Sequence, residues 1–510
     1  MSSHAEAIVI GGGMSGLAAA HRFTQLGIRP LLLEARGQCG GLVFGAPIGG
    51  VRVDLGAESF ARRSAATAEL AEELGLEVVT PAGESWIWAH DGSTDGTGDG
   101  EQPGHAFRIP HGVLGIPTDL DDPQVADALS EEGLARARED LTLGPDAGAD
   151  AADLATLVTT RLGPEVLDRL VDPVAGGVHS VHPSQLAVDI VAPGLREALA
   201  AEGSLVGAAA ALRAKAPEGS VVASVSGGLF RLVEALVSAI DAGGGTVRPR
   251  RLVTGIARDG SGWLVTHHEA GRAPNPADPP VPVGEPEQHW APKLVIALDG
   301  RAALDLLRSL PELNIGDWEL PRGADLTQVC VTVTRPELDA APRGSGLLVT
   351  PVHDGDTPRV RCKALTHYSV KWPTTVTGSG RHVLRISYGR AGTPTPEPTL
   401  ADALADASVL LGIDLAETDV AGHAVIHYPN SLPPHTPEHR ERVAELTQAA
   451  AELEGFEITG AWYAGTGLAA VVPHGRAVAE KLSVGASTLG SHDDDDDDGT
   501  ESGAKGGSGQ

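Results

Sequence analysis

The stretch IVIGGGMSG, residues 8–16, decides the fold of this chain. It begins as a short apolar run and continues into three glycines spaced as G-x-G-x-x-G. Apolar residues at helical spacing follow over about 14–26, and a second apolar run at 31–33 ends at Glu34. Strand, glycine turn, helix, strand and acidic residue in this order are typical of a dinucleotide-binding βαβ unit.

Each glycine of this turn has a predicted role. Gly11 allows the tight turn, Gly13 lets a pyrophosphate approach the backbone, and Gly16 lets helix and strand pack closely. The N–H groups and the dipole of the helix start attract phosphate. Glu34 follows Gly16 by 18 residues, a spacing at which a carboxylate accepts hydrogen bonds from a ribose diol. The alternative is a glycine-rich turn in an ordinary α/β domain, which would not require the acidic residue.

Composition excludes several classes of protein. The 510 residues, 42% of them hydrophobic, are enough for two or three domains with sizeable cores. The net charge of −30 is unsuited to nucleic-acid binding, which needs a basic face. No run reaches the roughly 18 apolar residues that span a bilayer, and the apolar N-terminus lacks the basic region of an export signal. We therefore expect a cytoplasmic protein. The three scattered cysteines indicate neither a disulfide framework nor a metal site.

The patterning predicts an α/β protein whose Rossmann-like nucleotide-binding domain is built from both chain ends. A mixed α+β substrate domain and a helical insertion lie between those ends in the sequence, and the chain closes with an acidic, Gly/Ser-rich tail that we expect to be disordered. The expected boundaries are 1–75, 220–300 and 436–485 for the nucleotide-binding domain, 107–215 for the helical subdomain, 76–106 and 301–435 for the substrate-binding domain, and 486–510 for the tail.

Local patterns predict individual elements between these boundaries. Polar or proline-rich composition predicts exposed loops at 91–104 and 272–288. Helices are expected at 153–162, 164–171, 230–240, 400–412, 438–453 and 475–482. Strands are expected at 246–248, 253–256, 263–267, 294–298, 327–334, 346–350, 360–365, 382–388 and 458–464, those of the substrate domain forming a mainly antiparallel sheet.

A second motif indicates which dinucleotide is bound. The order Glu-Ala-Arg-x-x-x-Gly-Gly, residues 34–41, resembles the second fingerprint of flavoproteins of the amine-oxidase and protoporphyrinogen-oxidase superfamily. In that superfamily the glycine pair passes close to the FAD phosphates. Residues 53–60, VDLGAESF, resemble the segment that passes beside the flavin ring. Asp54 within it can equally be a simple turn residue.

The middle of the chain narrows the resemblance to the flavin-dependent porphyrinogen oxidases. Residues 173–186, PVAGGVHSVHPSQL, resemble a signature of the bacterial members of that family. The closing segment 464–473, AGTGLAAVVP, resembles the last FAD motif, so the similarity runs from about residue 5 to 485. Two departures affect the expected contacts. Leu42 stands where family members often carry a basic residue, and residues 469–473, AAVVP, stand where the closing motif often reads GvGIP, so its glycines are lost.

The resemblance implies FAD as cofactor and a porphyrinogen as substrate. No catalytic side chain is expected, because the flavin N5 accepts the hydride. The residues expected to contact FAD are Gly11, Gly12, Gly13, Met14, Ser15, Gly16, Glu34, Ala35, Arg36, Gly40, Gly41, Leu42, Gly56, Ala57, Glu58, Ser59, Val253, Tyr428, Gly465, Ala470, Val471 and Val472. Substrate carboxylates should meet basic side chains, and the candidates for substrate contact are Arg62, Arg63, His179, Arg361, Lys363 and Lys371, each of which can instead have a structural or surface role.

The implied reaction is the oxidation of coproporphyrinogen III to coproporphyrin III with O2, releasing H2O2, in haem biosynthesis. Protoporphyrinogen IX oxidation is the nearest alternative, since the two substrates differ in carboxylate count. A flavin amine oxidase needs an aromatic cage, and only 3% of the residues are aromatic. A carotenoid-type desaturase would carry a more apolar, membrane-inserting segment, and a non-enzymatic FAD-holding scaffold would not need residues 173–186. Transient contact with a ferrochelatase and peripheral contact with a membrane are left open.

Overall fold

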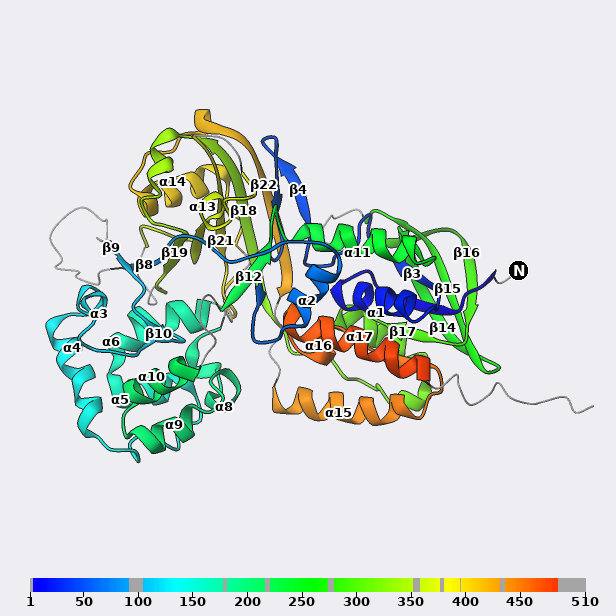
Figure 1. The fold of residues 1–510 in the computed structure, drawn as a ribbon, viewed down its shortest axis with the longest axis horizontal. Coiled ribbons are helices and arrows are strands. Elements are labelled where there is room, and N and C mark those ends of the chain that lie inside the picture. Colours follow the sequence, from blue (N-terminus) through cyan, green and yellow to red (C-terminus); the bar gives the residue numbers. More distant parts are fainter. Residues whose placement is uncertain are drawn as a thin grey trace, which may run out of the picture.

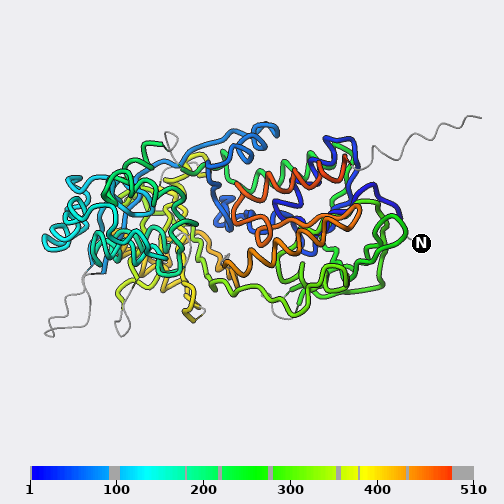
Figure 2. The backbone as a smooth tube through the Cα atoms, turned by 90° about the horizontal axis from the view of Figure 1, so that it is seen from below, coloured from blue at the N-terminus to red at the C-terminus, as the bar shows by residue number. Residues whose placement is uncertain are grey.

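The computed structural model describes residues 3–90, 104–177, 181–215, 221–273, 279–351, 358–376, 380–394, 396–431 and 436–484. Nearly all of the predicted polar loop at 91–104, the candidate His179 and the acidic tail at 486–510 lie outside these ranges. The described residues form an elongated molecule, with the helical segment (cyan) at one end and the first and last elements of the chain towards the other (Figures 1 and 2). Every helix in these ranges is too short or too polar to cross a bilayer.

A five-stranded parallel sheet combines strands from both ends of the chain, which confirms the predicted Rossmann-like fold. The strand that leads into the glycine turn is the central one, and the strand that ends at Glu34 lies next to it. The last strand of the chain is at one edge. In spatial order the strands are β13 (Thr246–Pro249), β3 (Pro30–Glu34), β2 (Ala7–Ile10), β17 (Leu294–Ile296) and β23 (Phe456–Ile458).

The central strands are continuously apolar because layers of structure cover both faces of this sheet. On β2, Ala7 and Val9 join one buried cluster, and Ile8 and Ile10 join another. The first cluster is completed by helices α1 (Met14–Gln25), α11 (Phe230–Ala242) and α17 (Leu468–Val484). The second is completed by α12 (Gly300–Leu307), α15 (Pro437–Ala451) and a four-stranded sheet of β1 (Ser3–His4), β16 (Val281–Ala291), β15 (Gly262–Gly271) and β14 (Arg251–Asp259).

A seven-stranded sheet forms the core of the predicted substrate domain. Neighbouring strands are antiparallel except for one parallel pair, β19 (Gly346–Val349) with β8 (Ser85–His90). Helix α14 (Leu400–Leu411) covers one face, and the hairpin of β4 (Gly45–Ile48) and β5 (Val51–Asp54) packs on the other. The order is β22 (Val420–Ser431), β18 (Ala324–Thr334), β21 (Arg381–Tyr388), β20 (Ala364–His367), β19 (Gly346–Val349), β8 (Ser85–His90) and β9 (Gly104–Arg108).

Residues 109–215 form a mostly helical insertion whose buried cluster also takes in residues of β8 and β9, and the predicted boundary at 107 falls within β9. Its core includes the π-helix η2 (Leu167–Gly176), which contains Pro173 and carries the start of the signature segment 173–186. The other helices of eight or more residues in it are α4 (Glu131–Arg138), α5 (Leu154–Leu162), α9 (Leu195–Glu202) and α10 (Leu205–Lys215).

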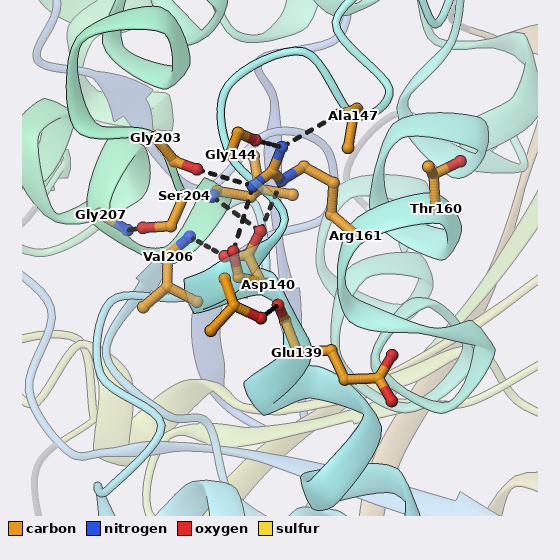
Figure 3. A network of polar contacts seen from close by, with 12 residues as sticks. Glu139, Asp140, Gly144, Ala147, Thr160, Arg161, Gly203, Ser204, Val206 and Gly207 are labelled. Carbon is orange, nitrogen blue, oxygen red and sulfur yellow. Dashed lines mark hydrogen bonds and ion pairs between the residues drawn. The ribbon is translucent and has the colours of Figure 1, made fainter.

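A buried ion pair connects three parts of this insertion (Figure 3). Arg161 on α5 binds the carboxylate of Asp140 with Nε and the backbone carbonyls of Gly144, Ala147 and Gly203 with its remaining nitrogens. Asp140 also accepts hydrogen bonds from the N–H groups of Leu205 and Val206 at the start of α10. Both charged side chains are fully buried, so each depends on the other for charge neutralisation.

Four local predictions are wrong. The proline-rich segment 272–288 is a loop only in part, because strand β16 starts at Val281 and pairs with β15. Proline is tolerated there since β16 gains its second partner, β1, only at 289–290, so residues 281–288 form an edge. The expected strand 458–464 ends at residue 458, and the short helix α16 (Ala461–Ala464) replaces the remainder. The final helix starts at residue 468 rather than 475, and the strand expected at 360–365 lies at 364–367.

Candidate FAD site

The glycine turn leaves an open space at only one of its three motif positions. A Cβ atom added at Gly11 would lie 2.3 Å from the carbonyl oxygen of Ala297, and one at Gly16 would lie 2.0 Å from that of Gly11. A Cβ at Gly13 would meet no atom within 4 Å. The first and third glycines are therefore needed for packing, whereas the second faces the space that a pyrophosphate requires.

The start of α1 is able to bind phosphate. Gly13 caps this helix, no side chain bonds to its first turn, and no acidic residue lies in that turn. The first N–H groups of a helix have no partner within the helix, and together with its dipole they attract anions. The arrangement of Gly13 and the helix start thus fits a dinucleotide.

Glu34 lies at the end of β3 beside the same turn. Its Oε2 accepts a hydrogen bond from the Gly12 N–H at 2.7 Å, and its Oε1 accepts one from the Arg36 N–H at 2.7 Å. A carboxylate has about four lone-pair sites, so two more hydrogen bonds can be accepted from a ribose. The two backbone contacts hold the carboxylate in position for them.

The second glycine pair packs against the first turn. The Gly40 N–H donates to the Gly12 carbonyl at 2.7 Å, and Gly40 forms a β-bridge with Gly13. At Gly41, which has φ of +62°, the nearest atom to an added Cβ is the Cα of Gly13 at 3.4 Å. The two glycine segments therefore lie side by side, as a shared phosphate site requires. Leu42, the departure from the family pattern, is 57% exposed next to them.

Asp54 has a structural role that differs from that of a simple turn residue. Its carboxylate accepts hydrogen bonds from the N–H groups of Leu229 and Phe230 at the start of α11, and from the hydroxyl of Tyr368 at 2.8 Å. The side chain is fully buried. Burial raises the pKa of Asp54, and these three hydrogen bonds oppose the rise by stabilising the ionised form.

Glu58, a predicted FAD residue, forms an ion-pair cluster with two cations. Its carboxylate lies 2.6 Å from Lys371 Nζ and also binds Arg385, a buried residue on β21. Burial alone would raise the pKa of Glu58, but the charges of Lys371 and Arg385 outweigh it and lower the pKa to about 2. Arg385 further donates to the carbonyl of Gly56 at 2.6 Å and to Gln328. This cluster fixes segment 56–59 against the seven-stranded sheet.

Arg385 was missed by sequence reasoning. The only signal was a charged residue within the pattern RHVLRISY, at a position where a strand buried on both faces would carry an apolar side chain. The partner of Arg385 is more than 300 residues away in the sequence, and no local pattern reveals such a pairing.

Helix α17, which begins within the closing motif, packs directly onto α1. A Cβ at Gly475 of α17 would lie 2.3 Å from the Ser15 carbonyl oxygen, so the two helices are in close contact. Val471 and Val472 belong to the buried cluster of this face, and their side chains are 7% and 0% exposed. Gly467 precedes the helix and faces open space, like Gly13.

Tyr428 and Val253 lie on different sheets. The hydroxyl of Tyr428 on β22 donates to the carbonyl of Leu55, and burial raises the pKa of Tyr428 to about 12. It thus reaches the segment that resembles the flavin-flanking one. Val253 lies on β14 and packs against the buried cluster that contains Leu31 and Leu33.

The candidate substrate residues are not all on one surface. Lys371 binds Glu58, and Arg63 donates to the carbonyl of Thr466 in the closing motif at 3.4 Å. Arg62 neighbours Arg63 and is likewise exposed. Arg361 instead pairs with Asp402 on α14, which covers the face of the sheet opposite Arg385. Burial lowers the pKa of Lys363 to about 8.

Comparison with known proteins extends over almost the whole chain. The coproporphyrinogen III oxidase of Mycobacterium tuberculosis is 28% identical over 493 residues, 93% of this chain and 96% of that protein. The one of Staphylococcus aureus is 24% identical over 502 residues, 93% of this chain and 98% of that protein.

Solved structures share the fold. A crystal structure from Exiguobacterium sp. 255-15, provisionally assigned as a protoporphyrinogen oxidase, superposes with a TM-score of 0.73 at 22% identity, covering 95% of this chain and 99% of that one. Reduced UDP-galactopyranose mutase superposes with a TM-score of 0.63 at 14% identity, covering 96% of both chains. The sequence profile of the flavin containing amine oxidoreductases matches residues 14–278, more than half of the 510 residues. The chain therefore belongs to the family of flavin containing amine oxidoreductases, and it is an FAD-dependent oxidoreductase.

Proposed function

We propose that this protein oxidises coproporphyrinogen III to coproporphyrin III with O2 as electron acceptor. The observation that carries this proposal is the end-to-end similarity to coproporphyrinogen III oxidases, which covers 86–94% of the chain in relatives from several bacteria. The chloroplast protoporphyrinogen oxidase of spinach matches only 36% of the chain. Coproporphyrinogen is therefore favoured over protoporphyrinogen.

The reaction removes six hydrogens from the macrocycle, and three O2 molecules take them up as three H2O2. Bound FAD would supply the two-electron chemistry of this reaction, between a saturated meso carbon of the substrate and O2. The side chains of this protein would then bind and position FAD and the porphyrinogen rather than act as acids or bases. We place the reaction in haem biosynthesis in the cytoplasm, where a ferrochelatase would take up the porphyrin product and insert iron into it.

Three groups of residues would position the cofactor and the substrate. The start of α1 and the glycines at 13, 41 and 467 leave room for the diphosphate, and Glu34 supplies acceptors for the ribose. The ion pairs of Glu58 with Lys371 and Arg385 hold segment 56–59 in place. Arg62 and Arg63 are exposed beside the closing motif and are suited to bind substrate carboxylates.

The test is an anaerobic reaction of the FAD-loaded protein with each porphyrinogen. We expect coproporphyrinogen III to bleach the yellow flavin absorbance, and air to restore it with release of H2O2. The specificity constant should be higher for coproporphyrinogen III than for protoporphyrinogen IX. A flavin that stays oxidised with both substrates would refute the proposal, and bleaching by primary amines instead would favour an amine oxidase.

A further inference from the structure

Two histidines and a glutamate gather on one face of the β14–β16 sheet, away from the glycine turns. His267 on β15 lies directly opposite Glu287 on β16, and His289 follows Glu287 by two residues. Directly paired residues, and residues two apart on a strand, share a face of a sheet. One ligand atom from each of the three side chains lies within 4.8 Å of the other two. We call these three residues the β15–β16 triad.

The two imidazoles of the triad are buried with unused nitrogen atoms. His267 is 0% exposed, and within the described ranges neither of its ring nitrogens has a hydrogen-bond partner. His289 is 7% exposed; its Nδ1 bonds to the hydroxyl of Ser3, and its Nε2 has no partner in the same ranges. Buried polar atoms are nearly always hydrogen-bonded, so three such nitrogens beside one carboxylate call for an explanation.

The contact with Ser3 gives His289 the arrangement of a metal ligand. Histidines that bind metals commonly donate from one ring nitrogen to an oxygen, which leaves the lone pair of the other nitrogen for the ion. In His289 this would direct Nε2 to the ion while Nδ1–H donates to the Ser3 hydroxyl. The rings of His267 and His289 lie almost parallel, with centroids 5.0 Å apart.

From this geometry we propose that His267, Glu287 and His289 form a binding site for a divalent transition-metal ion of the zinc class. Two imidazoles and one carboxylate are a ligand set that zinc accepts, with a fourth position left for water or an external ligand. Mg²⁺ and Ca²⁺ prefer sites made of oxygen atoms only. Tetrahedral bonds of about 2.1 Å separate ligand atoms by about 3.4 Å, so modest side-chain rotations would close the site.

Two arginines compete with the ion for Glu287. Arg248 lies 3.5 Å and Arg251 lies 3.3 Å from its carboxylate oxygens, and all three side chains are partly exposed. Exposed ion pairs of this kind contribute about 0–1 kcal/mol. A metal ion held by two imidazoles can therefore displace one of the two arginines from the Glu287 carboxylate. Burial lowers the pKa of His267 to about 4, so its imidazole is uncharged at neutral pH and one of its two ring nitrogens keeps a lone pair.

The test compares two neighbouring histidines of the same strand. The full chain loaded with FAD is stripped of metal and dialysed against Zn²⁺, and in parallel against Mg²⁺, and bound metal is then measured. His267→Gln removes a proposed ligand, whereas His268→Gln changes the next residue of β15, which is not one of the three proposed ligands and bonds to the Gly284 carbonyl. We expect wild type and His268→Gln to bind one equivalent of Zn²⁺ more than His267→Gln does, with no such difference for Mg²⁺.

Equal Zn²⁺ binding by all three proteins would overturn the proposal. The acidic run 493–498 is present in each of them, so any ion bound there cancels in the comparison. Because a buried substitution at His267 can impair folding, Glu287→Gln serves as a second variant at an exposed position, and it should also lose the equivalent. Arg251→Gln should bind Zn²⁺ about threefold more tightly, since it removes a competing charge; unchanged or weaker binding would overturn the assignment of Glu287 as a ligand.

Discussion

The hydroxyl of Tyr368 lies 2.8 Å from the carboxylate of Asp54, across 314 residues of sequence. Asp54 ends strand β5, lies within the segment that resembles the flavin-flanking one, and also holds the start of α11. Tyr368 comes from the seven-stranded sheet region. This hydrogen bond therefore links the β4–β5 hairpin and the start of α11 to the region of the seven-stranded sheet, and both of its residues are buried.

Replacing Tyr368 by Phe should reduce the free energy of unfolding by about 1–3 kcal/mol, because a buried carboxylate loses one of its hydrogen-bond donors. Urea unfolding of the FAD-loaded protein measures this. Tyr463→Phe is the matched control, since its hydroxyl bonds to Thr447 at an exposed position and its loss should cost little. Equal effects of the two substitutions would show that the contact with Asp54 contributes nothing specific.

Glu58 should make stability depend on pH under acidic conditions. Its pKa is about 2 in the folded protein against 4.5 for the unperturbed group, so the folded state binds fewer protons between these values. The stabilisation is then fully present above about pH 4.5 and is lost as pH falls towards 2. A shift of this size corresponds to about 3 kcal/mol. Urea unfolding at a series of pH values should give Glu58→Gln a shallower loss of stability than wild type over this interval.

The comparison for Glu58 is Glu84→Gln, which removes one carboxylate from an exposed pair with Arg108. That variant should follow the wild-type pH dependence, because exposed ion pairs contribute little. If Glu58→Gln retained the wild-type slope, the pairing with Lys371 and Arg385 would not lower the pKa of Glu58 as described.

Two glycines of the first turn should respond differently to alanine. Gly13→Ala places a methyl group in open space at a backbone conformation that alanine adopts readily, with φ of −69°. The apoprotein should keep its stability but bind FAD about tenfold more weakly, because the methyl group would meet the pyrophosphate. Gly16→Ala should destabilise the apoprotein by about 1–3 kcal/mol. Thermal unfolding and flavin fluorescence separate the two effects, and weaker FAD binding caused by Gly16→Ala alone would contradict the assignment.

Arg161 should be essential to the helical insertion. Arg161→Met leaves Asp140 buried without its counter-charge, which should cost about 3–5 kcal/mol. Limited proteolysis should then cut first within 107–215. Arg138→Met is the control, because its pair with Asp121 is exposed. Similar proteolysis of the two variants would contradict the role given to the buried pair.

The two candidate substrate arginines should differ in kinetics if the proposed function holds. Arg63 lies beside the closing motif, whereas Arg361 pairs with Asp402 on the far side of the sheet. Arg63→Ala should raise the KM for coproporphyrinogen III about tenfold, as expected when one charged hydrogen bond to a carboxylate is lost. Arg361→Ala should leave KM unchanged. A raised KM in Arg361→Ala alone would place substrate binding on the opposite face of the sheet.

The residues proposed for the FAD site could be selected from the sequence because their signals are local. The glycine turn and Glu34 lie within 24 residues of one another, from Gly11 to Glu34, and their spacing reflects one strand–helix–strand unit. The same is true of the parallel strands, whose continuous apolar runs follow from burial on both faces. Strand β16 was missed because its prolines and charges reflect an exposed edge, where the usual strand pattern is relaxed.

The primary structure, read alone, was enough to establish the Rossmann-like fold, its assembly from both chain ends and the use of FAD, because short-range spacing encodes turns, helices and phosphate-binding amides. The pairing of Glu58 with Arg385, the capping role of Asp54 and the meeting of His267 with Glu287 and His289 emerged only from the folded chain. These contacts depend on strand register and on how separate layers pack. No local sequence pattern indicates which distant residues will meet in this way.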